Sequence, residues 1–121
     1  MSIQRTFDNN RMSMIVRDGS TVYLSGQTAA DPGTSAHDQT VACLAKIDAL
    51  LSEAGSSRSH LLSVLIHLKE GTDFADMNAA WDEWIADVPK PARTCVIAGF
   101  PRPEVLVEIT VVAKAVSAEH G

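Results

Sequence analysis

The sequence has little cysteine and no concentration of positive charge, and these shortages exclude several classes of protein. Cys43 and Cys95 are its only cysteines, too few for a disulfide framework or a zinc site, so we expect a reducing compartment. The chain has 10 Lys and Arg residues, which form no run, and its formal net charge is −5. We therefore expect no nucleic-acid partner, because such binding neutralises phosphates with basic side chains.

Long apolar runs are also missing. The longest unbroken apolar stretch is only a few residues, far short of the roughly 20 that span a bilayer. The first residues show no basic region followed by an apolar stretch, so no signal peptide is expected. We predict a cytoplasmic protein without a membrane partner.

The chain does contain enough apolar sequence for one ordinary domain. Hydrophobic residues make up 45% of its 121 residues and charged residues 21%, which is typical of a soluble globular protein. A chain of this length buries about two thirds of its unfolded surface and folds without disulfides or metals. We predict a single domain over residues 1–121.

The prediction of the fold starts from the stretch 91–113, which contains two strand-like halves. Two prolines, Pro101 and Pro103, lie between the halves, and proline cannot donate to a sheet ladder. We therefore expect the halves to pair as an antiparallel hairpin with its turn at 100–103.

This hairpin register predicts which side chains share a face. Counting back from the turn places Cys95 opposite Glu108 and Arg93 opposite Thr110. Arg93 and Glu108 then lie on one face, whereas the other face is almost wholly apolar and packs against helices. A carboxylate that is buried without a partner is costly, so Glu108 needs one, and Arg93 is the candidate. A plain structural ion pair explains these two residues equally well.

Ahead of this stretch we expect an edge strand, a hairpin and a helix. A weak pattern over 1–7 indicates a short edge strand. Asp18-Gly19, between two strand-like runs within 12–24, is the strongest short-range signal for a hairpin turn. Apolar residues at helical spacing behind a capping box predict the first helix over 35–55.

A strand and a second helix follow. The strand at 61–69 has apolar residues on both parities, so both of its faces must be covered; His67 falls on its more polar parity. Asp73 is expected to cap a helix whose apolar stripe includes Trp81. Asn78 lies beside that stripe, where a hydrogen bond to nearby backbone would be the simplest role for its amide.

These elements predict an α+β fold, with a mostly antiparallel sheet and two helices on one face. The second face has no helix to cover it. It is expected to carry apolar side chains, namely Leu65, Ile97, Leu106 and Val112. We therefore predict that this face is buried against another subunit.

Three motifs in the sequence resemble the RidA/YjgF family of enamine and imine deaminases. They are PARTCV at 91–96 followed by VEI at 107–109, LSGQ at 24–27, and FADMNAAWDEW at 74–84. The last motif is closer to a divergent branch with YoaB-like sequences. The resemblance covers nearly the whole chain and implies a chorismate-mutase-like fold. It also implies a homotrimer whose sheets form a central barrel, with three clefts between subunits.

The resemblance implies roles for individual residues. The carboxylate-binding arginine of the family falls on Arg93, and its water-holding glutamate falls on Glu108. Cys95, Ser25 and Asn78 match further positions of the cleft. The implied reaction is hydrolysis of a small 2-imino acid to the 2-oxo acid and ammonia, in which Arg93 binds the substrate carboxylate and Glu108 activates water. No metal and no organic cofactor are implied.

Other functions fit parts of the pattern. The best-studied deaminase branch has an N-terminal tyrosine where this chain has the stretch 10–13, and Met12 offers no phenol hydroxyl. This departure favours a chaperone-like trimer, or one that binds a small carboxylate without turnover. RNA cleavage, an activity attributed to some relatives, is disfavoured by the acidic charge. Chorismate mutase activity would fit the fold, but the sequence offers one clear site arginine, which is few for binding a dicarboxylate substrate.

Overall fold

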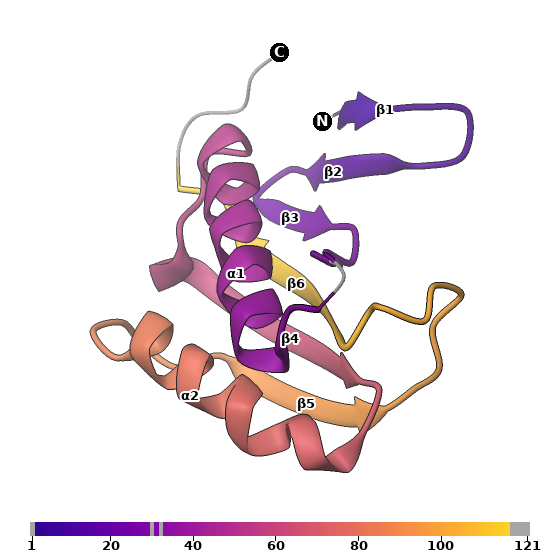
Figure 1. Cartoon of the computed structure of the whole chain (residues 1–121). Helices are drawn as coiled ribbons and strands as arrows, with labels where there is room; N and C mark the ends of the chain where they lie inside the picture. Colours follow the sequence, from indigo (N-terminus) through magenta and orange to yellow (C-terminus); the bar gives the residue numbers. More distant parts are fainter. Residues whose placement is uncertain (1, 30, 32, 117–121) are drawn as a thin grey trace.

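A six-stranded sheet carries two helices on one face in the computed structural model, which describes residues 2–29, 31 and 33–116 (Figure 1). The elements are β1 (Ile3–Asp8), β2 (Ser13–Asp18), β3 (Thr21–Leu24), α1 (Ala36–Glu53), β4 (Leu61–Leu68), α2 (Phe74–Ile85), β5 (Ala92–Ile97) and β6 (Val107–Lys114), with 3-10 helices η1 (Arg58–His60) and η2 (Gly71–Asp73). The strand order is β1-β2-β3-β6-β4-β5. All neighbours are antiparallel except β4 and β5. The predicted α+β class is confirmed.

The N-terminal strands form as predicted. β2 and β3 pair through the turn at Asp18-Gly19, and Gly19 has a φ of 61°, which glycine adopts without a steric penalty. β1 is the edge strand on this side of the sheet. The turn-forming residues at 30–33 predict a loop, of which Ala30 and Pro32 lie outside the described residues.

Both helices begin where the sequence indicates, although only one has the expected cap. Ser35 Oγ accepts a hydrogen bond from the backbone N–H of Asp38 at 3.1 Å, which starts α1. Asp73 is at the N-cap position of α2 as predicted, but its side chain makes no capping hydrogen bond. Gly55, with a φ of 77°, follows the end of α1.

The predicted C-terminal hairpin does not form, because β4 lies between β5 and β6. Neither the Cys95–Glu108 pair nor the Arg93–Thr110 pair exists. The observed pairs are Arg93 with Val64, Cys95 with Ile66, Thr110 with Leu65 and Glu108 with His67. The reason lies in β4, whose apolar residues of both parities suit a central strand with a neighbour on each side.

This register decides which face each residue occupies. We call the face of the sheet without helices the open face. Glu108 lies on the open face as predicted, because its neighbours Val107 and Ile109 are buried beneath the helices. Arg93 instead pairs with Val64, which is buried on the helix-covered face, and partners in a parallel pair point to the same side. The predicted shared face of Arg93 and Glu108 is therefore wrong.

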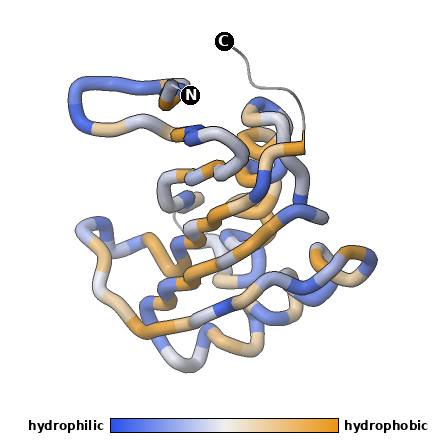
Figure 2. The backbone as a smooth tube through the Cα atoms, turned by 180° about the vertical axis from the view of Figure 1, so that it is seen from behind, coloured by the Kyte–Doolittle hydropathy of each residue, from blue (hydrophilic) through white to orange (hydrophobic). Residues whose placement is uncertain are grey.

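The open face retains much apolar surface. Figure 2 shows the molecule from behind the view of Figure 1. In this view no helix lies over the central strands, which are largely hydrophobic. Leu65, Leu106 and Val112 are half-buried. Ile97 pairs with Leu68 on the helix-covered side, so it does not belong to this face as expected. The burial of the open face against another subunit stays a prediction.

Within the part of the chain that the structure describes, no helix has both the length and the apolar character to cross a bilayer.

Candidate functional site

Arg93 forms the first half of the candidate site, on the helix-covered face of the edge strand β5. Its Nη1 donates a hydrogen bond to Asn78 Oδ1 of α2 at 2.8 Å. Its guanidinium carbon lies 5.4 Å from the ring centroid of Trp81, one turn further along α2, within cation–π distance. A guanidinium has five N–H donors in a rigid fork, so most of them stay available for a carboxylate ligand.

Asn78 therefore has a different role from the simplest one suggested by the sequence, since its amide oxygen holds the arginine. Trp81, which the helical pattern assigns to the core, is indeed buried, with 6% of its surface exposed. It also forms the flat support beneath the guanidinium. The local spacing of Asn78 and Trp81 in FADMNAAWDEW brings both side chains toward β5.

Cys95 lies two residues beyond Arg93 on the same face and packs against the core. Burial raises the pKa of the Cys95 thiol, and the nearby positive charge of Arg93 only partly offsets this. The thiol is therefore mostly protonated at neutral pH and is a weak nucleophile. Cys43 is fully buried, and burial raises its pKa to about 12, so it has a structural role.

Glu108 forms the second half of the site, on the open face of the central strand β6. Its side chain is 34% exposed, and its Oε1 lies 3.7 Å from Nδ1 of His67, the residue directly opposite on β4. On the other side is Gly26, where an added Cβ would lie 2.8 Å from Glu108 Cδ and 3.0 Å from Oε2. The carboxylate thus lies between an imidazole and bare backbone.

The LSGQ motif places Gly26 against this carboxylate. Gln27 forms an isolated bridge with Ile109, with backbone hydrogen bonds of 2.9 and 3.1 Å in the two directions. Ser25 is fixed from the other side, because its backbone N–H donates to Met14 O at 3.0 Å. Its hydroxyl accepts a hydrogen bond from Gln27 Nε2 at 3.2 Å. The motif is therefore anchored on both sides of Gly26.

The sheet separates the two halves within one chain. Arg93, Asn78 and Cys95 are grouped on the helix-covered face at the β5 edge, whereas Glu108 lies on the open face beside the segment that carries Ser25. β4 lies between β5 and β6, so the two strands are roughly 10 Å apart. The predicted Arg93–Glu108 ion pair is absent from the chain, and a purely structural pairing no longer explains these two residues.

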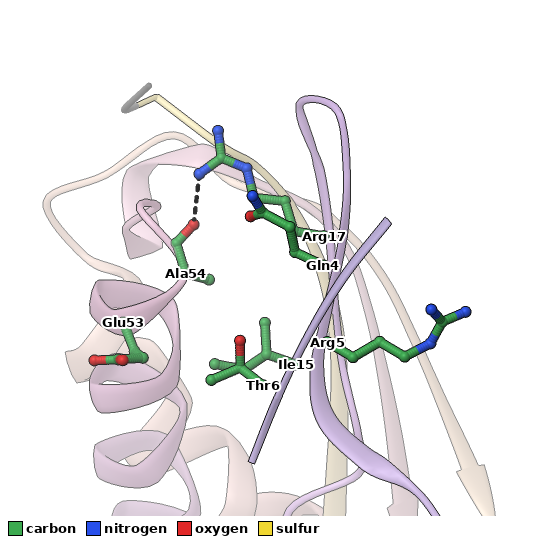
Figure 3. Close-up of a pocket in the computed structure, with 7 residues that line it drawn as sticks. All are labelled: Gln4, Arg5, Thr6, Ile15, Arg17, Glu53 and Ala54. Carbon is green, nitrogen blue, oxygen red and sulfur yellow. Dashed lines mark hydrogen bonds between the residues drawn. The ribbon is translucent and has the colours of Figure 1, made fainter. Parts of the chain in front are cut away.

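A cavity of about 330 Å³ lies away from both halves, between the β1–β2 hairpin and the end of α1 (Figure 3). Arg17 closes its upper end in Figure 3, since Nη1 donates to Ala54 O at 3.1 Å. Its Nε donates to Gly19 O at 3.0 Å. These bonds tie the end of α1 to the β2–β3 turn, so the arginine stabilises the fold. Arg5 points away from the cavity.

The described residues contain no cluster of three or more His, Cys, Asp or Glu side chains placed to hold a metal ion.

Sequence reasoning named Arg93, Glu108, Asn78 and Cys95, but it missed three contributions. The helical pattern assigns Trp81 to the core alone, and nothing in LSGQ distinguishes Gly26. The alternation of the strand shows only that His67 lies on its more polar parity. Its pairing with Glu108 depends on the strand order, which no local pattern contains.

Residues 4–115 match the family model described as Endoribonuclease L-PSP. The RutC family protein YoaB of Escherichia coli K12 is 39% identical over 113 residues, which cover 93% of this chain and 98% of YoaB. A RutC family protein of Haemophilus influenzae is 36% identical over 114 residues, covering 93% and 98% of the two chains.

Solved structures show the same architecture. NMB1025 of Neisseria meningitidis, a member of the YjgF protein family, is similar with a TM-score of 0.92 and 39% identity, covering 98% of each chain. A putative translation initiation inhibitor from Salmonella typhimurium has a TM-score of 0.84 and 38% identity, covering 94% of this chain and 98% of its own.

Proposed function

The chain belongs to the endoribonuclease L-PSP family, also called the YjgF/RidA family, and on this premise we propose that it hydrolyses small 2-imino acids to 2-oxo acids and ammonia. Such imines arise when enamines such as 2-aminoacrylate tautomerise. The resemblance drawn from the three motifs, including the closeness to YoaB, is confirmed at the level of the family.

The observation that supports this proposal most is that Arg93 and Glu108 are not paired with each other. Among the described residues, Arg93 makes its polar contact with Asn78 and its aromatic contact with the Trp81 ring. Glu108 keeps a third of its side chain exposed. A guanidinium and a carboxylate that do not neutralise each other both keep their capacity to act on a ligand.

Arg93 supplies the binding step. Its planar fork matches a carboxylate in a bidentate arrangement, which fixes both the position and the orientation of the substrate. The bond to Asn78 Oδ1 and the ring of Trp81 hold the plane of the guanidinium before the ligand arrives. Less side-chain freedom is then lost on binding.

Glu108 supplies the proton transfers. Water adds to C2 of the imine while Glu108 accepts one of its protons, giving a tetrahedral carbinolamine. This proton passes to the nitrogen, which makes the carbinolamine neutral. Glu108 then transfers the proton of the new hydroxyl group to the nitrogen as well, the C2–N bond breaks as the C2–O double bond forms, and the 2-oxo acid and ammonia leave. Substrate and water together contain every atom of the products, so the residues need only bind, orient and move a proton.

We place both halves in one cleft between neighbouring copies of the chain, with Arg93 from one copy and Glu108 from the next. The apolar open face supports this arrangement, because contiguous exposed apolar surface marks interaction sites. A homotrimer with three such clefts is the proposed assembly. Sedimentation of the purified protein tests it, and a monomer at micromolar concentration would remove the cleft.

The reaction is tested with imino acids generated fresh in a coupled assay, using the wild-type protein and Glu108→Gln. Glutamine keeps the size of the side chain but accepts no proton at neutral pH, so kcat should fall by about 100-fold or more. Affinity for a 2-oxo acid should change little, because Arg93 is intact. Glu104→Gln is the matched control, since Glu104 pairs with Arg102 on the surface at 2.9 Å.

Unchanged turnover in a folded Glu108→Gln trimer would contradict the role of this carboxylate. Carboxylate binding without any turnover in the wild-type protein would instead identify a binding protein. A parallel assay with single-stranded RNA tests for RNA cleavage, the activity in the family description. We expect little cleavage, because a formal charge of −5 gives little electrostatic attraction for phosphates.

A further inference from the structure

His67 is the one ionisable side chain that the strand register places directly opposite Glu108. On the open face, His67 is flanked by Val96 of β5 on one side and by Glu108 of β6 on the other. The valine offers no hydrogen-bond acceptor in its side chain. Glu108 is therefore the charged neighbour across the ladder, with Oε1 at 3.7 Å from His67 Nδ1.

The Nδ1 atom of His67 is buried and has no hydrogen-bond partner among the described residues. Buried polar atoms are nearly always hydrogen-bonded, so an orphan of this kind calls for an explanation. The 3.7 Å separation exceeds ordinary hydrogen-bond distance by only about 0.5 Å. A small rotation of either side chain brings Nδ1 and Oε1 into contact.

Gly26 restricts the carboxylate from the opposite side. The position of a Cβ on Gly26 is 3.0 Å from Oε2 and 2.8 Å from Cδ, so any side chain at this position would force the carboxylate to shift. The two oxygens of Glu108 therefore have different surroundings. Oε1 is on the imidazole side, and Oε2 is beside the bare backbone of Gly26.

We propose that His67 is a positioning residue for Glu108, whose Nδ1–H donates to Oε1 and leaves Oε2 to accept the proton from the attacking water. This inference rests on the proposed function. His67 touches no reacting atom and acts through the carboxylate alone. It converts a flexible, partly exposed glutamate into a base with one fixed oxygen, and such orientation has a large effect on rate.

Two variants separate this role from simple packing. His67→Phe keeps a flat ring but removes the donor, and kcat should fall by about 10-fold to 100-fold, as expected for a misplaced catalytic group. His67→Asn places an amide N–H near the former Nδ1 position and should recover most of this loss. KM should stay within about twofold in both, because Arg93 is unchanged.

The matched control is His37→Asn. His37 also pairs with a carboxylate, since Nδ1 lies 3.2 Å from Asp38 Oδ1, but this pair is on the surface of α1. Its kcat should equal that of the wild-type protein. Thermal melts of all variants show whether each is folded. Wild-type kcat in His67→Phe would overturn the proposal, as would an equal loss of kcat in folded His67→Asn and His67→Phe.

Nitrogen-15 NMR of the imidazole tests the pair without any substrate. The neutral His67 ring should carry its proton on Nδ1, and Glu108→Gln should shift both ring nitrogens. If the wild-type protein hydrolyses no imino acid, the proposed function fails, while these spectra still decide whether His67 holds Glu108. An Nε2-protonated ring whose nitrogens do not respond to Glu108→Gln would overturn the inference.

Discussion

The two halves of the site differ in how firmly the chain holds them. Arg93 is fixed by direct contacts, with Asn78 at 2.8 Å and the Trp81 ring beneath the guanidinium. Glu108 has its charged neighbour at 3.7 Å and glycine backbone on the other side. Arg93 is thus preorganised beneath the helices, whereas Glu108 lies on the face that no helix of the described residues covers.

We infer from this difference that one chain contains both components of the proposed chemistry but not a complete site. A sheet has two faces, and a residue's strand parity decides which face it occupies. Placing the two groups on opposite faces prevents them from neutralising each other. We propose that they meet only when the open face of one copy approaches the β5 edge of another, so assembly and activity should be lost together.

The largest effect should come from a substitution that disrupts the proposed contact through the open face. Leu65 is half-buried there, between Thr94 and Thr110 on the flanking strands. Leu65→Asp places a charge at the proposed contact, which is costly to bury without a partner, so the trimer should dissociate and imine hydrolysis should disappear. Sedimentation and the coupled assay measure the two outcomes on the same sample.

Val41→Asp is the control for this change. Val41 is 48% exposed on α1, on the other side of the sheet, so the variant should stay trimeric and active. A trimeric and active Leu65→Asp protein would show that the open face is not the contact surface.

The next effect should come from the binding half. Arg93→Ala should lower kcat/KM, and the fall should correspond to a loss of about 2 to 4 kcal/mol of transition-state stabilisation, as expected for a charge-assisted bond in a sheltered site. Arg93→Lys should not restore it, because an ammonium lacks the planar fork that aligns a carboxylate. Circular dichroism should show an intact fold in both. Arg102→Ala, at a position whose side chain is 63% exposed, serves as the control.

If Arg93→Ala keeps full activity, the substrate carboxylate is bound elsewhere. Rescue by Arg93→Lys would show that charge alone suffices and that the fork is not needed.

A smaller effect should come from the carboxylate half through Gly26→Ala. The added Cβ would lie 2.8 Å from Glu108 Cδ, so the carboxylate must shift. The shifted atoms are the far end of a flexible side chain, so the melting temperature should change little, whereas kcat should fall by about tenfold. Gly71→Ala is the control, because a Cβ there meets no atom within 4 Å. Equal kcat values for the two variants would contradict the proposed constraint.

Much of this comparison could be predicted from the sequence, because local patterns specify local structure. A few consecutive residues are enough to predict the Asp18-Gly19 turn. They are also enough to predict that Glu108 and Val107, as neighbours in a strand, point to opposite faces of the sheet. The pairing of β5 with β6 was wrong because a strand from elsewhere in the chain lies between them. A pattern within 91–113 holds no information about that insertion.

The same limitation applies to the site. Arg93 and Glu108 could be named from their residue types and motifs, and both occupy distinct polar surroundings in the structure. Their separation onto two faces could not be predicted, since it depends on β4 taking the central position. The pairing of His67 with Glu108 follows from that insertion too, so the sequence alone could not identify this neighbour.

The most direct test of the divided site is complementation between two inactive variants. Arg93→Ala and Glu108→Gln copies are refolded together in equal amounts and assayed for imine hydrolysis. If each cleft takes its arginine from one copy and its glutamate from the next, one cleft in each mixed trimer contains both native residues, which is about a quarter of all clefts when the copies assemble at random. The mixture should then recover about a quarter of the wild-type activity. A mixed trimer that remains as inactive as its parents would contradict the account.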